Sequence, residues 1–335
     1  MTATHGYPRP QLERKNWTSL NGAWEFALDP AAHWTSPAAV QWDATITVPF
    51  SPETQASGIA NTDFYRACWY RHVVQVAPLA AGERLLLHFG AVDFSATVWV
   101  NDQLVGRHQG GYTPFTIDLT ACQQPDNTFI IVVRAEDDPQ DLAKPRGKQD
   151  WLREPHSIWY PRTTGIWQTV WLERVPASAI DSIRWTPNLT RWELGLDVHL
   201  DGVARDDLRL RVKLHVGDLV LADDTYAVIA GEVSRRIALS DPGIDDYRNE
   251  LLWSPNHPTL IEAELELWGR RGELLDSVRS YTALRQIAVQ GDRFILNGRP
   301  MRMRLVLDQG YWLESGLTAP SDEALRRDVE LAKAM

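Results

Sequence analysis

The chain has 335 residues, of which 44% are hydrophobic and 23% are charged, which is typical of a soluble globular protein with more than one domain. Its net charge of −10 and its lack of any Lys/Arg block argue against a nucleic acid partner, because a phosphate backbone binds a cationic surface. No apolar run approaches the ~20 residues that a membrane span requires, so we expect no membrane partner.

The first residues, Met1 to Arg14, are polar and contain no apolar signal-peptide core. Cys68 and Cys122 are the only cysteines, and two thiols fit neither a disulfide framework nor a zinc motif. We therefore predict two buried thiols in a cytoplasmic protein. No histidine pair has the HxxxH spacing of metal ligands, and no nucleotide-binding glycine motif occurs, so we expect neither a metal nor a cofactor.

Period-2 alternation of apolar and polar residues predicts strands through the first half of the chain. Asn101-Asp102-Gln103 is a short polar turn of the hairpin type. Helical periodicity is missing here, so the pattern predicts an all-β jelly roll or sandwich. The predicted strands are Arg84 to Phe89, Thr97 to Val100, Leu104-Val105, Thr128 to Arg134 and Ile166 to Val175.

A long segment between Arg134 and Ile166 is rich in Asp, Pro, Lys, Arg and Trp. It is too long for a bare connection inside a compact domain, and loops of this length are commonly functional. A surface excursion held by its own salt bridges explains the composition equally well. Both interpretations stay open at this point.

A second β unit begins near Ile180. Clean alternation runs over Leu194 to Leu200, Leu208 to Val216 and Glu262 to Leu267. Strands with one apolar and one polar face at this spacing predict a small antiparallel sandwich of about 100 residues. Such a domain usually serves as a spacer or scaffold.

The pattern changes again from about Ala283. Strands are predicted at Phe294 to Leu296 and, after an Asn-Gly turn, at Met301 to Leu307. Ser321 is placed to cap a helix with an apolar stripe at Leu325, Val329 and Ala332. One βα unit cannot bury its own faces, so we expect the chain to stop inside a third domain.

Six segments, in order, resemble motifs of glycoside hydrolase family 2, the β-galactosidase and β-glucuronidase type. The segments are Trp17 to Trp24 (WTSLNGAW), Cys68 to Arg71 (CWYR), Phe89 to Arg107, Arg162 to Trp167 (RTTGIW), Leu252 to Pro258 (LWSPNHP) and Phe294 to Pro300 (FILNGRP). The resemblance implies a jelly-roll domain at residues 1–178, an immunoglobulin-like sandwich at 179–284 and the start of a (β/α)8 barrel at 285–335. The predicted fold class is therefore mainly β.

The same resemblance implies retaining hydrolysis of a β-glycoside by two glutamates, one a nucleophile and the other an acid and base. In the family these lie at the ends of the fourth and seventh barrel strands. A barrel takes about 250 residues, so we expect both glutamates downstream of Met335. No catalytic residue is assigned within the chain, and the chain alone is predicted to be inactive.

Substrate contacts are predicted at five positions. Asp308, Gln309 and Trp312 would follow the first barrel strand, where the family places sugar-contacting residues, although an ordinary strand end is the alternative. Arg146 and Lys148 lie in the long loop and would meet an acidic or hydroxyl-rich sugar, although a salt-bridged loop is equally consistent.

Two other functions remain open beside the glycosidase, whose partner would be a carbohydrate substrate. The chain contains 15 tryptophans, and indole rings stack on sugar rings as well as filling cores, so a non-catalytic carbohydrate-binding protein is one alternative. Front domains of the family also make subunit contacts, so an assembly module that forms a homo-oligomer is the other.

Overall fold

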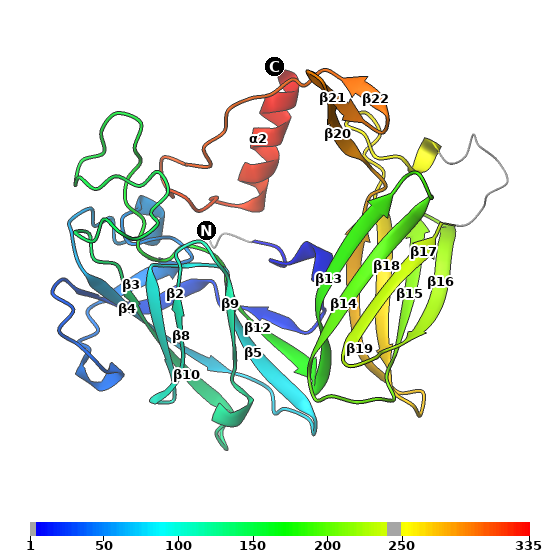
Figure 1. Cartoon of the computed structure of the whole chain (residues 1–335). Helices are drawn as coiled ribbons and strands as arrows, with labels where there is room; N and C mark the ends of the chain where they lie inside the picture. Colours follow the sequence, from blue (N-terminus) through cyan, green and yellow to red (C-terminus); the bar gives the residue numbers. More distant parts are fainter. Residues whose placement is uncertain (1–4, 240–248) are drawn as a thin grey trace. The chain divides into compact units, whose positions relative to one another are not determined.

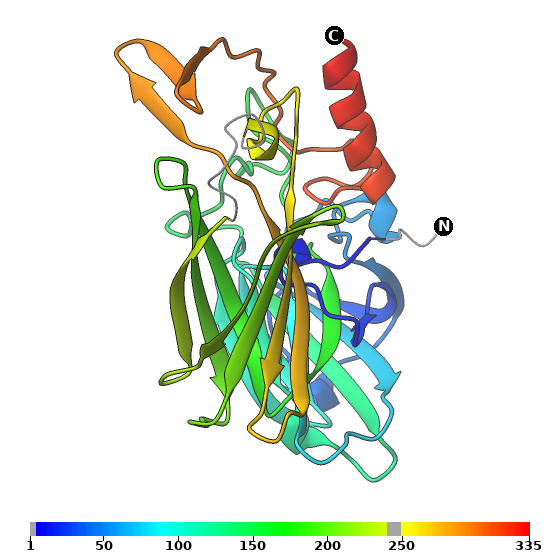
Figure 2. The same cartoon turned by 90° about the vertical axis from the view of Figure 1, so that its right-hand side faces the viewer.

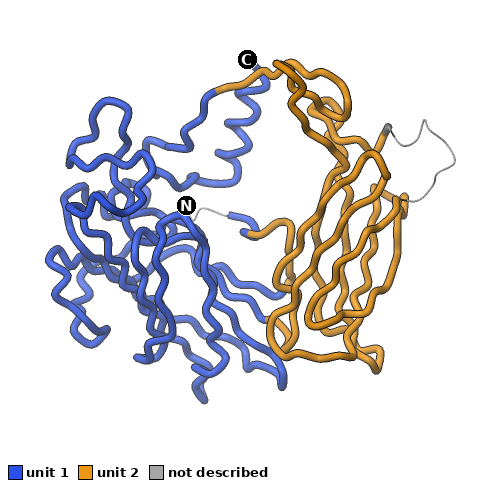
Figure 3. The backbone as a smooth tube through the Cα atoms, viewed as in Figure 1, with its two compact units in different colours: residues 1–8, 16–174, 307–335 blue, residues 9–15, 175–306 orange. Residues whose placement is uncertain are grey.

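The computed structural model describes residues 5–239 and 249–335, which are mainly β (Figure 1). The chain divides into two compact units (Figure 3). Unit 1 comprises residues 1–8, 16–174 and 307–335, and unit 2 comprises residues 9–15 and 175–306. Within the described ranges, no helix is long and apolar enough to cross a membrane.

Unit 1 contains a six-stranded sheet with the order β3-β2-β4-β10-β7-β8 and a four-stranded sheet with the order β1-β12-β5-β9. The short strands β6 and β11 pair with each other as a separate antiparallel two-stranded sheet. The strands are β1 Trp17–Ser19, β2 Gly22–Asp29, β3 Ala44–Val48, β4 Ala67–Gln75, β5 Glu83–Phe89, β6 Val92–Asp93, β7 Ser95–Val100, β8 Gln103–Gln109, β9 Phe115–Asp118, β10 Thr128–Glu136, β11 Gly165–Ile166 and β12 Val170–Pro176. The 3-10 turns of this unit are η2 Pro37–Ala39, η3 Gln55–Ser57 and η4 Thr120–Cys122.

The core of unit 1 lies between its two larger sheets. Alternate residues of a strand point to the same face, so Trp24 and Phe26 of β2 and Val98 of β7 meet Leu85 and Leu87 of β5 in one buried cluster. The predicted strands at Arg84 to Phe89, Thr97 to Val100 and Thr128 to Arg134 are confirmed as β5, β7 and β10. The segment Ile166 to Val175 is split, because β11 ends at Ile166 and β12 begins at Val170.

The predicted hairpin turn joins β7 to β8. Asn101 and Asp102 both have positive φ, 49° and 64°, as a two-residue type I′ turn requires. The Asn101 side chain donates to the carbonyls of Cys122 (3.1 Å) and Thr128 (3.3 Å). Cys122 and Cys68 are both free and buried, which confirms the prediction for the two thiols.

Unit 2 is a sandwich of a three-stranded sheet, β13-β14-β17, and a four-stranded sheet, β16-β15-β18-β19 (Figure 2). Leu194, Leu196 and Val198 of β14 face Leu210 and Val212 of β15 across its core, so the predicted alternation is confirmed. The elements are η1 Pro10–Leu12, β13 Ser178–Asn188, β14 Glu193–Gly202, β15 Arg209–Val216, β16 Leu219–Ala227, β17 Glu232–Ala238, η5 Asn249–Leu251, β18 Ile261–Trp268 and β19 Leu274–Thr282.

A small three-stranded sheet completes unit 2. It consists of β20 Ile287–Gln290, β21 Arg293–Leu296 and β22 Arg299–Met301, and its second turn is the predicted Asn297-Gly298, with φ values of 52° and 76°. The predicted strand from Met301 to Leu307 is wrong beyond Met301, because residues 302–307 have no strand partner in the described structure. Leu305 and Leu307 accordingly remain 77% and 87% exposed.

The predicted C-terminal helix is confirmed as α2, Asp322–Ala334. The Ser321 hydroxyl accepts a hydrogen bond from the Ala324 amide at 3.2 Å, which satisfies one of the free N–H groups of the first turn. The apolar stripe is on the surface in this structure, since Leu325 and Val329 are 46% and 62% exposed.

Candidate functional site

A pocket of about 480 Å³ lies entirely within unit 1. Its lining comes from three segments far apart in the sequence, residues 53–62, 160–163 and 311–316. The middle segment belongs to the 137–164 loop, the connection between β10 and β11. The long loop identified in the sequence therefore supplies one wall of a cavity large enough for a small ligand.

Aromatic rings form part of the pocket wall. Tyr160 from the 137–164 loop stacks on Tyr311, with ring centroids 3.8 Å apart and an interplanar angle of 12°. Trp312 lines the pocket beside them. Burial raises the pKa of Tyr311, and the neighbouring Tyr112 adds to the shift. The phenol of Tyr311 therefore remains neutral at physiological pH and can donate or accept a hydrogen bond.

The 311–318 segment is anchored to the body of unit 1. Trp312 and Gly316 exchange two backbone hydrogen bonds at 2.9 Å. The Ala56 amide donates to the Glu314 carbonyl at 2.9 Å, and the Thr318 hydroxyl donates to the Trp167 carbonyl at 2.6 Å. These bonds fix Tyr311 and Trp312 against the loop that they face.

Glu53 supplies a carboxylate to the same pocket. It accepts hydrogen bonds from the Tyr65 hydroxyl at 2.5 Å and from the Thr164 amide at 3.2 Å. Glu53 as a residue is partly exposed, while burial around its carboxyl group raises the pKa and the charge of Arg162 partly offsets that effect. The site thus combines aromatic faces with a hydrogen-bonding acid.

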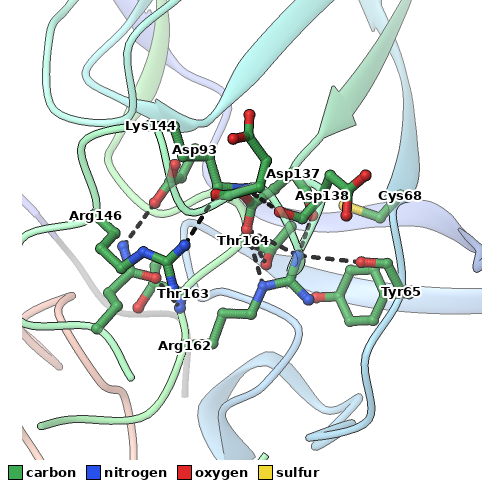
Figure 4. A network of polar contacts seen from close by, with 12 residues as sticks. Tyr65, Cys68, Asp93, Asp137, Asp138, Lys144, Arg146, Arg162, Thr163 and Thr164 are labelled. Carbon is green, nitrogen blue, oxygen red and sulfur yellow. Dashed lines mark hydrogen bonds and ion pairs between the residues drawn. The ribbon is translucent and has the colours of Figure 1, made fainter. Parts of the chain in front are cut away.

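A buried ion cluster holds the 137–164 loop behind the pocket (Figure 4). Asp137 pairs with Lys144 and with Arg162, the latter at 2.8 Å, and the three side chains are only 4%, 8% and 10% exposed. Burial acts to raise the pKa of Asp137, but the two cations outweigh it and hold that pKa below its usual value. One carboxylate thus faces two cations in this cluster, and further acids lie nearby.

Asp93 of β6 is one of these further acids. It is 3% exposed and accepts a 2.7 Å hydrogen bond from Gln149, whose side chain also donates to Tyr112 and accepts from the Thr163 amide. Burial, reinforced by the negative charge of Asp137, raises the pKa of Asp93 to about 7. Gln149 therefore ties the loop to the sheet through an acid that gains its charge only near neutral pH.

The five predicted contact residues are not gathered in one place. Trp312 lines the pocket, whereas Asp308 is exposed and its carboxylate accepts from the Gly310 amide at 2.8 Å. Gln309 is partly exposed, and it is not among the residues that line the 480 Å³ pocket.

The two predicted loop cations have mainly local contacts. Arg146 donates to the Asp141 carbonyl at 2.9 Å and lines a separate, water-sized cavity beside Asp93. Lys148 is exposed, and its carbonyl accepts from the Tyr160 amide at 2.9 Å. Their role as sugar contacts stays a prediction.

Sequence reasoning missed Tyr160, Tyr311 and Glu53. The two tyrosines had a signal, because Tyr160 stands in the long loop and Tyr311 in the segment LDQGYW beside Trp312. Glu53 had none, because it enters the pocket through contacts with Tyr65 and Thr164, twelve and 111 positions away.

Comparison with known proteins identifies this architecture. Residues 17–176 match the family described as Glycosyl hydrolases family 2, sugar binding domain. Residues 17–176 are thus a sugar-binding domain of glycoside hydrolase family 2. The matched region contains the 137–164 loop and two of the three segments that line the pocket.

Curated relatives carry glycosidase names. The chain is 24% identical over 323 residues to a β-galactosidase of Thermoanaerobacter pseudethanolicus, covering 94% of this chain and 40% of that protein. It is 27% identical over 308 residues to a β-glucuronidase of Paenibacillus borealis, covering 87% of this chain and 49% of that protein. The chain thus spans less than half the length of these two relatives.

Solved structures share the fold. A Bifidobacterium dentium β-glucuronidase complexed with coumarin-3-O-glucuronide matches 96% of this chain and 57% of its own, with a TM-score of 0.75 at 20% identity. A Bacteroides uniformis β-glucuronidase matches 95% of this chain and 38% of its own, with a TM-score of 0.72 at 24% identity.

Proposed function

We propose that the chain is the N-terminal region of a retaining β-glycosidase that hydrolyses O-glycosidic bonds in carbohydrate metabolism. The family 2 match over residues 17–176 is the observation that carries the proposal. In this account residues 1–178 are a jelly-roll domain, 179–284 an immunoglobulin-like sandwich and 285–335 the entry to a (β/α)8 barrel. The two β sandwiches and their order along the chain support the first two parts of that division.

The proposed chemistry needs two carboxyl groups across the scissile bond, one attacking the anomeric carbon and the other exchanging protons with the leaving group and then with water. The acids at this pocket and behind it are better suited to structural roles. Glu53 in the pocket wall is bonded to Tyr65 and Thr164. Asp137 is neutralised by Lys144 and Arg162, and Asp93 is committed to Gln149. We therefore assign the two catalytic glutamates to sequence beyond Met335.

Sugar binding is the contribution that we assign to the chain itself. Aromatic rings suit the apolar C–H faces of a pyranose, and a few polar groups orient its hydroxyls. Tyr311 and Trp312 supply the rings, and Glu53 supplies an acceptor at the pocket wall. A single pyranose unit is the ligand that this combination fits.

Hydrolysis by the product of the intact gene tests the proposed activity. It should release nitrophenol from a nitrophenyl β-D-galactoside or β-D-glucuronide, while the purified 335-residue chain should release none. A full-length product that is folded but inactive on β-glycosides would overturn the proposal. Turnover by the 335-residue chain would overturn the assignment of the glutamates.

A non-catalytic carbohydrate-binding protein is the second candidate, because the aromatic pocket is complete without any catalytic pair. It predicts saturable glycan binding by the intact gene product with no hydrolysis. Activity of that product on any β-glycoside decides between the two functions.

A further inference from the structure

The 137–164 loop carries a partly exposed aromatic cluster, which consists of Trp151, His156 and Trp159. Trp151 is 41% exposed, and its ring makes edge contacts with Trp159 and His156 at centroid distances of 5.2 and 5.3 Å. Partly solvated indoles lose some of the burial that normally stabilises them. A cluster of this kind on a surface loop is therefore a candidate binding surface.

The loop that carries the cluster is closed at its base. The Tyr160 amide donates to the Lys148 carbonyl at 2.9 Å, and the Asp150 amide donates to the Tyr160 carbonyl at 2.8 Å. Residues 151–159, which we call the aromatic loop, form the excursion between these two points. Gln149 at the base is 4% exposed and bonded to Asp93, so the aromatic loop stands on a buried anchor.

The Asp150 carboxylate holds the aromatic loop at two positions. It accepts from the Leu152 amide at 3.0 Å and from the His156 amide at 2.6 Å, and it contacts the His156 ring at 2.7 Å. Burial acts to raise the pKa of Asp150, but these two amides hold it below its usual value. The carboxylate therefore stays charged and the rings are presented in a fixed arrangement, which lowers the entropic cost of binding.

The aromatic loop is continuous with the pocket. Trp159 contacts Trp151, and the next residue, Tyr160, stacks on Tyr311 in the pocket wall. The two aromatic pairs are therefore joined through consecutive residues of one loop, Trp159 and Tyr160. A ligand longer than one ring that leaves the pocket on the side of this loop would come near Trp159 and Trp151.

We propose that the aromatic loop is a second carbohydrate-binding subsite, which stacks an additional pyranose of a β-linked oligosaccharide whose terminal unit occupies the pocket. This inference rests on the proposed function and narrows its substrate class to oligosaccharides. Trp151 supplies the stacking face, while the buried Asp150 is a positioning residue that keeps the loop in shape.

The test compares ligand lengths by isothermal titration calorimetry on the 335-residue chain. The neutral comparison uses methyl β-D-galactoside, which probes the pocket alone, and β-1,4-galactotetraose, which probes both subsites. The acidic comparison uses methyl β-D-glucuronide and a hyaluronan tetrasaccharide in the same way. In one of the two comparisons the tetrasaccharide should bind more tightly than the monosaccharide. The Trp151→Ala change should weaken only the tetrasaccharide, by roughly 2- to 12-fold, the factor for one aromatic contact of about 0.5–1.5 kcal/mol.

Two variants control for loss of loop structure. Trp151→Phe retains a ring and should retain most of the tetrasaccharide affinity. Ile158→Ala removes an apolar side chain of the same loop that is 64% exposed and offers no ring for a sugar to stack on, so it should change neither affinity. Equal loss in Trp151→Ala and Ile158→Ala would overturn the proposal, because it would indicate a general effect on the loop.

Other outcomes separate this proposal from the proposed function. Monosaccharide binding that is lost in Tyr311→Ala, with no gain for tetrasaccharides, would support the pocket and overturn the second subsite. An absence of binding to all four sugars would overturn both. A change of oligomeric state in Trp151→Ala by light scattering, with sugar affinities unchanged, would overturn the subsite and assign the loop to a second copy of the chain.

Discussion

The Asp137→Asn change removes the charge that holds Lys144 and Arg162 in the interior of unit 1. The Asp137 and Arg162 charges lie 2.8 Å apart, a separation that gives about 6 kcal/mol of Coulomb attraction at an effective dielectric constant of about 20. Desolvation of both groups opposes this attraction, and the loss of one member of a buried pair typically costs about 3–5 kcal/mol. We expect a loss in this range, because two cations are left without their carboxylate.

Differential scanning calorimetry measures the consequence. A loss of about 3–5 kcal/mol corresponds to a decrease of roughly 6–20 °C in the Tm of a unit of this size. The neighbouring Asp138→Asn change is the matched control, because Asp138 and its partner Arg66 are 31% and 50% exposed. An exposed pair contributes less than about 1 kcal/mol, so the control should lower Tm only slightly. Equal decreases in Tm for the two variants would refute the conclusion that Asp137 holds the 137–164 loop in place.

Two further changes test the packing around the loop. The pKa of Asp93, about 7 in the folded chain, exceeds the ~3.9 of an unfolded Asp, so the folded state binds more protons between these values and wild type loses stability as pH rises through them. Asp93→Asn cannot ionise and should gain up to about 4 kcal/mol on wild type between pH 4 and 7; urea titrations showing a constant difference would contradict this. Gly165→Ala should cost about 2–5 kcal/mol in urea unfolding, because φ is +75° and an added Cβ would lie 2.1 Å from the Tyr70 hydroxyl. Gly58→Ala, with φ +81° and no atom within 4 Å, should cost only about 1–2 kcal/mol, and equal costs would show that the contact with Tyr70 is unimportant.

The sequence predicted the strands because their apolar residues repeat with a period that burial enforces. Val98 and Leu196 are buried for this reason, and the Asn101-Asp102 turn follows from residues that tolerate positive φ. These are local signals, and each can be recognised without its partner in space. The strand predicted over residues 301–307 shows the limit, since apolar residues alone do not supply a neighbouring strand to pair with.

The candidate site was only partly predictable. Trp312 and the long loop were identified, because an aromatic residue and an unusual loop length can be recognised from the sequence alone. The acids Asp93 and Asp137 were not, because their importance depends on Lys144, Gln149 and other groups that the fold brings together. The sequence alone does not distinguish an acidic residue in a solvated loop from one in a buried ion cluster.

The stereochemistry of hydrolysis tests the central claim most directly. Proton NMR of the intact gene product acting on a nitrophenyl β-glycoside follows the anomeric signal of the first sugar released. A retaining β-glycosidase must release the β-anomer first, with the α-anomer appearing only through slower mutarotation. Initial release of the α-anomer, or no hydrolysis of any β-glycoside by the folded protein, would contradict the account.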